Sequence, residues 1–450
     1  MKAKLALSLM TLLAFNTLDA KDAILTAFEG GKVSGEIRSF YINREYRGLD
    51  VHRDALAVGG WLRYETAPIY GVSAGAALYT TNKLNHKHKN DTSNDKTLLG
   101  KDGKSMSYLG EAYLKYVYEG MELKAGRGRF DSPMMGSDDA RELPNLFEGV
   151  FLSSKDFADT TITLAHVGKF AAGTFSNAYV HTASALDNNP LVSNPAYLSI
   201  TSGYSGVAGL MEHTGEFTNM GEYAFGRKNG GVSLAGVEYE GIANLKLTLW
   251  DYYAHNLFNT IYADALYSIK VADLGLYAGV QYIRQDGVGS EYAGKVGSDF
   301  VAGKVGAKYE GVDLYVATSY NSKKEGRVIN GGTITPWGGM PAYTQGMVTR
   351  HQFFAGTASY KAALSYNTKT HHTLDLTTIA YYAWFDMDAL NGYSTTPNRA
   401  SEVGCDFIYK PQDLKNLQLR FRANFPRDYR ETLGQNLGWN EYRFIANYTF

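Results

Sequence analysis

The chain ends on Asn440 to Phe450, Asn-Glu-Tyr-Arg-Phe-Ile-Ala-Asn-Tyr-Thr-Phe, and this stretch is the strongest guide to its fold. Side chains of a β-strand point alternately to opposite faces, so a period of two separates an aromatic face from a polar one. The aromatic face comprises Tyr442, Phe444, Ala446, Tyr448 and Phe450, and the polar face comprises Glu441, Arg443, Asn447 and Thr449, with Ile445 as the exception. Such a strand fits either a packed soluble core or a transmembrane barrel, in which the apolar face meets lipid and the polar face lines the lumen.

Composition favours one large all-β architecture. The 450 residues include 48 Gly, 34 Tyr and 21 Phe but only 10 Pro, which suits many strands joined by tight turns. The 44 Lys and Arg are balanced by 45 Asp and Glu, so charge gives no support to a nucleic-acid partner. No linker rich in Pro, Ser or one sign of charge divides the chain. We therefore expect a single domain over residues 21–450.

The N-terminus predicts export. Lys2 and Lys4 precede an apolar run from Leu5 to Phe15, and Leu18-Asp19-Ala20 follows it. This three-part layout is typical of a secretory signal peptide, here residues 1–20 with cleavage after Ala20. The apolar run is too short to cross a membrane as a helix.

Turns and loops alternate along the chain. Tyr-Glu-Gly recurs at 118–120, 239–241 and 309–311, each time between alternating segments, and Gly supplies the positive φ that tight hairpins need. The other connections are long and polar, at 82–105, 130–149, 167–230, 284–298, 321–350, 387–401 and 426–439. Short turns on one side and long loops on the other are typical of an outer-membrane barrel. The turn count predicts a transmembrane antiparallel β-barrel of about 18 strands, with 16 as the alternative, and 167–230 is long enough to contain a further hairpin.

A basic wall is expected inside this barrel. Leu417, Leu419, Phe421, Ala423 and Phe425 point to lipid if 417–425 is a strand, which turns Arg420 and Arg422 inward. The first and last strands close the barrel, so Arg38, Arg44 and Arg443 come from neighbouring strands. A row of guanidinium groups can guide anions electrostatically. The alternative is that these arginines pair locally with Glu36 and Glu441 and only keep the lumen hydrated.

The third external loop, 130–149, mixes acids with apolar residues. A merely solvated loop would not need Met134, Met135, Leu143, Leu146 and Phe147. We interpret it as a loop folded into the barrel that constricts the pore and presents Asp138 and Asp139 opposite the arginines, giving a transverse field. The alternative is an exposed loop capped by a short helix.

Two motifs resemble a known family. Ser34-Gly35-Glu36-Ile37-Arg38-Ser39-Phe40-Tyr41 and Ser137-Asp138-Asp139-Ala140-Arg141-Glu142-Leu143-Pro144-Asn145-Leu146-Phe147-Glu148-Gly149 are similar to the OprD-type porins, substrate-selective outer-membrane channels of Gram-negative bacteria. The resemblance implies 18 strands, an inward third loop, a basic ladder and passive uptake of small carboxylates, amino acids, peptides or ions. It marks Arg38, Asp138, Asp139 and Arg141 as pore-lining candidates. The chain also resembles the major porins of the Campylobacter group, which are trimeric, so both a monomer and a homotrimer are considered.

Other functions have weaker support. No nucleophile motif indicates an enzyme, and no cofactor is expected. His86-Lys87-His88 could bind a metal, but without further ligands at a defined spacing we expect a solvated loop and no metal. Cys405 alternates with Val403 and Phe407 on an apolar face, so we expect an inert thiol. The expected partners are small hydrophilic solutes and, around the barrel, outer-membrane lipid and lipopolysaccharide. The alternative is an adhesin or surface receptor whose long loops bind a partner, and a lumen that conducts ions would distinguish the porin from it.

Overall fold

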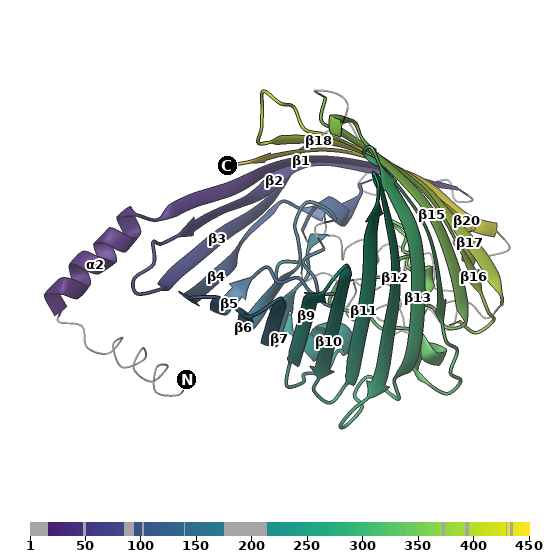
Figure 1. Cartoon of the computed structure of the whole chain (residues 1–450), viewed down its shortest axis with the longest axis horizontal. Helices are drawn as coiled ribbons and strands as arrows, with labels where there is room; N and C mark the ends of the chain where they lie inside the picture. The colour runs from purple at the N-terminus through teal and green to yellow at the C-terminus, as the bar shows by residue number, and fades with distance from the viewer. Residues whose placement is uncertain are drawn as a thin grey trace.

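The fold is that of a computed structural model, which describes residues 17–47, 51–84, 94–100, 103–138, 140–174, 214–339, 341–370, 374–391, 396–428, 430–432 and 435–450. A single sheet dominates it and curves round on itself (Figure 1). Residues 1–16, which hold most of the expected signal peptide, lie outside this description.

Eighteen long strands form the wall of a closed antiparallel barrel. They are β1 (Lys32–Arg47), β2 (Val51–Glu65), β3 (Val72–Lys83), β4 (Met106–Tyr118), β5 (Met121–Gly128), β6 (Leu146–Phe157), β7 (Thr160–Ala171), β9 (Val232–Ile242), β10 (Leu245–Ala254), β11 (Phe258–Val271), β12 (Leu274–Gly287), β13 (Gly297–Tyr309), β14 (Val312–Asn321), β15 (Thr357–Asn367), β16 (Leu376–Met387), β17 (Asn398–Tyr409), β18 (Leu417–Arg427) and β20 (Gln435–Thr449). The short β8 (Thr218–Asn219) pairs with β7, and β19 (Arg430–Thr432) pairs with β20.

The first and last strands close the ring. Ile37 of β1 is opposite Gly60 of β2 on one side and Tyr448 of β20 on the other. Figure 1 shows β1 and β18 along the same edge, where the C-terminus also lies. The prediction of 18 strands is confirmed, and the alternative of 16 is wrong.

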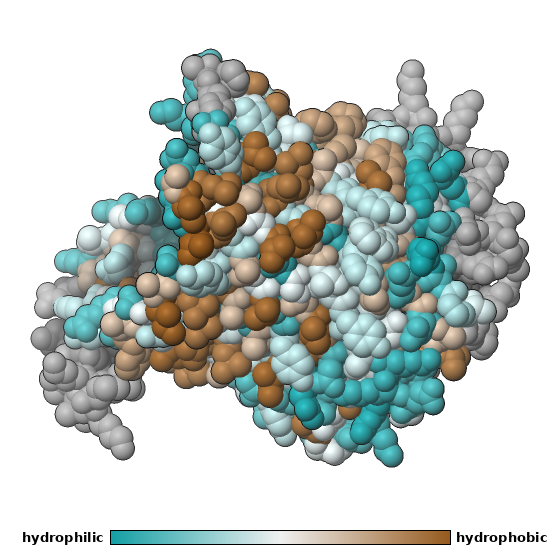
Figure 2. Space-filling model, turned by 45° about the vertical axis from the view of Figure 1, so that its right-hand side comes forward, coloured by the Kyte–Doolittle hydropathy of each residue, from teal (hydrophilic) through white to brown (hydrophobic). Residues whose placement is uncertain are grey.

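The outer face of the wall is apolar. Phe444, Tyr448 and Phe450 are exposed, whereas Arg443 and Glu441, which alternate with them, are buried inside. Figure 2 shows hydrophobic residues gathered over the middle of the face in view and hydrophilic residues toward its periphery. This is the distribution that a lipid-facing barrel requires. Cys405 lies on the same outer face as the exposed Val403 and Phe407.

Six of the nine connections at one end span nine or more residues, whereas none of the eight at the other end exceeds eight. Two of the expected Tyr-Glu-Gly turns are correct, because the strand ends fall at 118/121 and 309/312. Their positive φ is carried by Glu119 (51°), and by both Glu310 (45°) and Gly311 (82°). The glutamate therefore adopts the conformation that we had assigned to glycine alone.

The third Tyr-Glu-Gly was placed wrongly. Glu240 and Gly241 lie within β9, because a β-bulge there sets two residues of β9 against the single Lys246 of β10. Lys246 forms ion pairs with both Glu238 (2.6 Å) and Glu240 (3.2 Å). The turn follows at 243–244, where Asn244 has a φ of 66°.

Helices are few among the described residues. Thr17–Glu29 forms α2, which projects from the start of β1 (Figure 1), and Met220–Phe225 forms α5. Single turns of 3-10 helix occur at Lys96–Leu98, Val328–Gly331, His351–Phe353 and Thr368–Thr370. Of the helices described, none is long and apolar enough to cross a membrane. The extra hairpin considered for 167–230 falls partly on residues 175–213, outside the described residues, and the remainder holds the end of β7, β8 and α5.

Candidate functional site

The third connection folds into the barrel. It covers residues 129–145, because β6 begins at Leu146. The loop therefore ends four residues earlier than the expected residue 149. Met134 and Met135 are buried in the apolar cluster that lines this part of the interior, and the backbone N–H of Met134 donates to the Tyr252 hydroxyl (3.2 Å) on the far side of that cluster. An exposed loop with a short helical cap, the alternative from sequence, is not what the described residues form.

A second connection, residues 322–356 between β14 and β15, also folds inward. The side-chain amide of Gln285 donates to the Ile334 carbonyl (2.8 Å), and the Ile334 N–H donates back to it (2.7 Å). Trp337 stacks on Phe258 with ring centroids 5.8 Å apart. The two loops touch where the Gly339 N–H donates to Asp138 (2.8 Å). We had assigned this inward position to the third loop alone.

Glu402 holds residues 347–349 of the inward loop at 322–356. This carboxylate on β17 is fully buried, and it accepts hydrogen bonds from the backbone N–H groups of Met347 (2.8 Å), Val348 (3.2 Å) and Thr349 (3.0 Å) and from the Thr349 hydroxyl (2.6 Å). The Tyr381 hydroxyl also donates to it. Charge-assisted bonds of this kind are stronger than neutral ones, so they hold residues 347–349 of the loop firmly to β17.

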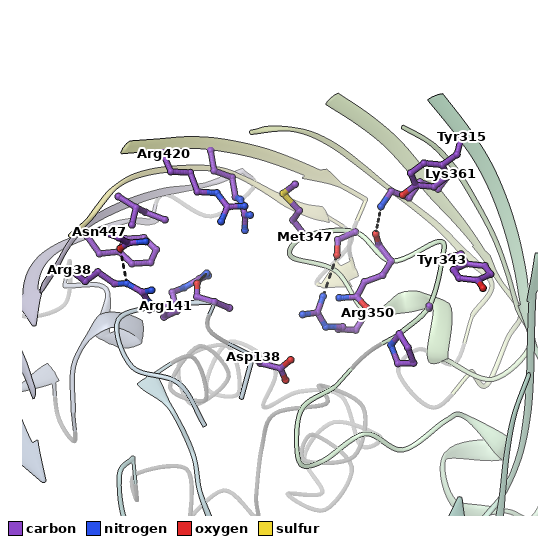
Figure 3. A pocket seen from close by; sticks show the side chains of 18 residues that line it. Arg38, Asp138, Arg141, Tyr315, Tyr343, Met347, Arg350, Lys361, Arg420 and Asn447 are labelled. Carbon is purple, nitrogen blue, oxygen red and sulfur yellow. Dashed lines mark hydrogen bonds between the residues drawn. The ribbon is translucent and has the colours of Figure 1, made fainter. Parts of the chain in front are cut away.

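A cavity of about 600 Å³ lies between these loops and the wall (Figure 3). Figure 3 shows Arg38, Arg141, Arg420 and Asn447 on one side and Met347, Arg350, Lys361 and Tyr343 on the other. The charged side chains that line it are Arg38, Asp138, Arg141, Arg350, Lys361, Arg420 and Arg422. Cations thus predominate around this space.

Two of the expected arginines share one carboxylate. Asp406 on β17 is fully buried and accepts from Nε of Arg420 (2.7 Å) and from a terminal nitrogen of Arg422 (2.7 Å). The guanidinium groups reach the cavity while the carboxylate lies behind them, because the side chains of Arg420 and Arg422 keep 27% and 14% exposure. Arg38 is tied to Glu36 (3.1 Å) and to Asn447 (2.9 Å).

A second carboxylate gathers the other arginines. Glu441 on β20 pairs with Arg44 (2.9 Å), with Arg141 of the third loop (3.1 Å) and with Arg443. Asp95 also pairs with Arg44 (3.2 Å). Burial lowers the pKa of Arg141, and the neighbouring Arg443 guanidinium acts in the same direction, whereas Glu441 opposes both. Arg443 faces inward but is buried in this cluster and does not line the cavity.

The expected acids have different fates. Asp138 lines the cavity, at a positive φ of 41°, and is engaged by the Gly339 N–H. Asp139 lies outside the described residues. Sequence reasoning missed Lys361 and Arg350. The alternation of β15 could have turned Lys361 inward, but nothing local in the sequence indicates that Arg350 returns to the wall.

The family model for the outer membrane porin, OprD family, matches residues 27–185 and 211–450. The chain belongs to the OprD porin family. It is accordingly an outer-membrane porin, and its fold and localisation agree with the expectations from sequence. No curated protein matches this OprD-family porin in sequence.

Solved structures share its fold at low sequence identity. Pseudomonas aeruginosa OpdK with vanillate aligns with a TM-score of 0.72 and 17% identity, covering 94% of this chain and 99% of OpdK. P. aeruginosa OccK9 (OpdG) aligns at 0.74 and 19%, with the same coverage. P. aeruginosa OccK2 (OpdF) in complex with glucuronate aligns at 0.71 and 18%, covering 94% of this chain and 98% of OccK2. Family and fold are thus those of channels.

Proposed function

We propose that this OprD-family porin favours small anionic solutes, carboxylates in particular, over cations. Arg38, Arg420 and Arg422 form the basic wall in this proposal, and the third loop with Asp138 and Arg141 narrows the passage. Solutes pass by diffusion, because binding to fixed cations in a hydrated lumen is strong enough to admit an anion and weak enough to release it.

The observation that carries the proposal is the arrangement around Asp406. A single buried carboxylate serves both Arg420 and Arg422, and in the described part of the chain no other carboxylate lies within ion-pair distance of either. One positive charge therefore remains uncompensated, and it faces the cavity. Because guanidinium groups bind carboxylates in a bidentate way, this surface suits a carboxylate solute.

The relatives give a second line of support. OpdK was solved with vanillate and OccK2 with glucuronate. Each of these molecules carries one carboxylate. At identities of 17% and 18%, the solutes themselves do not transfer to this chain, but the shared charged group agrees with the basic wall.

The test removes charge from the wall without leaving Asp406 buried and unpaired. The variant Arg420→Gln/Arg422→Gln/Asp406→Asn loses one net positive charge. Arg399→Gln is its matched control, because Arg399 lies on the outer face of β17, paired with Asp386, and its loss changes the net charge equally. Reversal potentials across a potassium chloride gradient should show a reduced preference for chloride in the triple variant. The control should keep the preference of the wild type. Equal reversal potentials in wild type and triple variant would contradict the proposal.

A further inference from the structure

A second cavity, of about 390 Å³, adjoins the first inside the barrel. It lies toward the short turns, since its lining includes Gly275, next to the first residue of β12, and Lys308, next to the last residue of β13. Tyr315 and Tyr343 line both cavities. A solute that leaves the first cavity toward the short turns therefore meets the second.

A segment of the inward loop at residues 322–356 forms the boundary between the two cavities. The Thr344 hydroxyl is 2.6 Å from that of Ser319 on β14, and Lys361 on β15 donates to the Gln345 carbonyl at 2.8 Å. The Tyr343 hydroxyl donates to Asp264 on β11. Residues 343–345 thus cross the inner face of β14 and are fastened to the wall on both sides.

Two lysines flank this crossing. Ala317 on β14 is directly opposite Lys304 on β13 and Lys361 on β15. The two lysines are therefore two strand spacings apart at the backbone, roughly 10 Å. Because Ala317 is small, it leaves the space between them to the loop and to solutes. Lys361 lines the first cavity and Lys304 the second.

Both ammonium groups contact aromatic rings. The Lys304 nitrogen is 4.1 Å from the centroid of Tyr343 and 5.9 Å from that of Tyr277, and the Lys361 nitrogen is 4.9 Å from the centroid of Tyr381. Within the described ranges neither lysine has a carboxylate at ion-pair distance. Lys308, by contrast, pairs with Asp313 at 3.4 Å. Ring faces compensate a cation only in part, so Lys304 keeps the capacity to bind an anion.

We propose that Lys304 and the rings of Tyr343 and Tyr277 form a second solute site, which takes a small monocarboxylate with an apolar body. The carboxylate binds the Lys304 ammonium, and the apolar body lies against the tyrosine rings. Tyr343 divides this site from the arginine-lined cavity, so transit proceeds in two binding steps. This inference rests on the proposed anion preference and adds to it the site and the apolar requirement.

Block of single-channel current by hexanoate tests the site. Lys304→Gln should raise the dissociation constant of block roughly fivefold, the effect of one unit charge at about 4 Å in a water-like dielectric. Lys304→Arg should restore the wild-type value, because it keeps the charge. Lys308→Gln is the matched control: it removes a charge from the same strand and cavity, but one already paired with Asp313, and should change the constant less than twofold.

Each outcome has a definite meaning. An unchanged constant in Lys304→Gln, equal losses in Lys304→Gln and Lys308→Gln, or a loss that Lys304→Arg does not restore would overturn the site. The same would follow if hexanoate and acetate blocked with equal constants, since the apolar body would then contribute nothing. The reversal potential of the wild type separates the two proposals. If the pore is anion-selective but Lys304→Gln leaves the dissociation constant of hexanoate block unchanged, only the second site is refuted. A cation-selective pore would refute the proposed function.

Discussion

The carboxylate of Asp138 accepts a hydrogen bond from the backbone N–H of Gly339 at 2.8 Å and thereby joins two of the loops that fold into the barrel. The Gly136 N–H donates to the Trp337 carbonyl (3.2 Å) beside it. Gly338 and Gly339 have φ values of 74° and 67°, which glycine adopts without strain. The passage is consequently bounded by two loops in contact rather than by one.

Two variants of Asp138 distinguish the effect of its charge from the effect of its hydrogen bond to Gly339. Asp138→Asn keeps an oxygen that can accept from Gly339, so we expect unchanged conductance noise but a shift toward anions, because a negative charge is lost. Asp138→Ala removes the acceptor, so the loops should part more often and the open-channel noise should rise. Single-channel recordings of both variants measure this, and identical noise in the two would show that the contact does not hold the loops.

Glu402 should control the second loop. Glu402→Ala removes the acceptor of the Val348 and Thr349 N–H groups and of the Thr349 hydroxyl, while the Met347 N–H keeps the Tyr381 hydroxyl (3.1 Å). Hydrogen bonds to a charged group each contribute about 1.5–3 kcal/mol, so we expect frequent conductance fluctuations and faster proteolysis within residues 341–350. Glu402→Gln keeps one acceptor oxygen and should be intermediate. Protease resistance equal to wild type in Glu402→Ala would mean that other contacts fix the loop.

Glu441 should matter for stability more than for selectivity. Its carboxylate pairs with Arg44, Arg141 and Arg443, all of them buried. Removing one partner from a buried ionic group typically costs about 3–5 kcal/mol. Glu441→Gln should therefore lower the temperature at which the barrel unfolds in detergent, followed as the shift between folded and unfolded bands on a gel. Glu36→Gln, which weakens the pair with Arg38 (3.1 Å), should lower it less, and the reverse order would contradict the assignment.

A charged residue on the outer face should destabilise the barrel most near the middle of the bilayer. Val280 lies in the middle of β12 with 63% exposure, facing away from the lumen. Val280→Arg should destabilise the barrel in lipid by about 2–4 kcal/mol, as expected near the bilayer midplane, whereas Val280→Ala should cost much less. Urea unfolding in lipid vesicles measures both. Equal stability of the two variants would show that Val280 does not face the hydrocarbon.

Most of the fold was predictable because a lipid-facing barrel imposes alternation on every strand. The period of two in 417–425 was enough to predict that Arg420 and Arg422 point inward. The apolar residues Met134 and Met135 were enough to predict that the third loop folds into the interior. These inferences are local. They need only the residues of one segment and a decision about which face meets lipid.

The parts that sequence did not reveal depend on contacts between distant segments. The inward loop at residues 322–356 is held by Glu402, which is 53 residues after Thr349, and no local pattern shows that a buried carboxylate will accept from Thr349. The pairing of Asp406 with Arg420 and Arg422 required the register of β17 against β18. The bulge opposite Lys246 moved one turn by three residues, from 240–241 to 243–244, since an extra residue in a strand leaves its alternation almost intact.

The central claim is that the cavity wall at Arg38, Arg420 and Arg422 makes this porin favour anions. The most direct test is the reversal potential of single wild-type channels in a planar bilayer with a potassium chloride gradient. The account predicts steady ohmic openings whose reversal potential is displaced toward that of chloride. A reversal potential displaced toward that of potassium, or a silent bilayer with the protein demonstrably inserted, would contradict it.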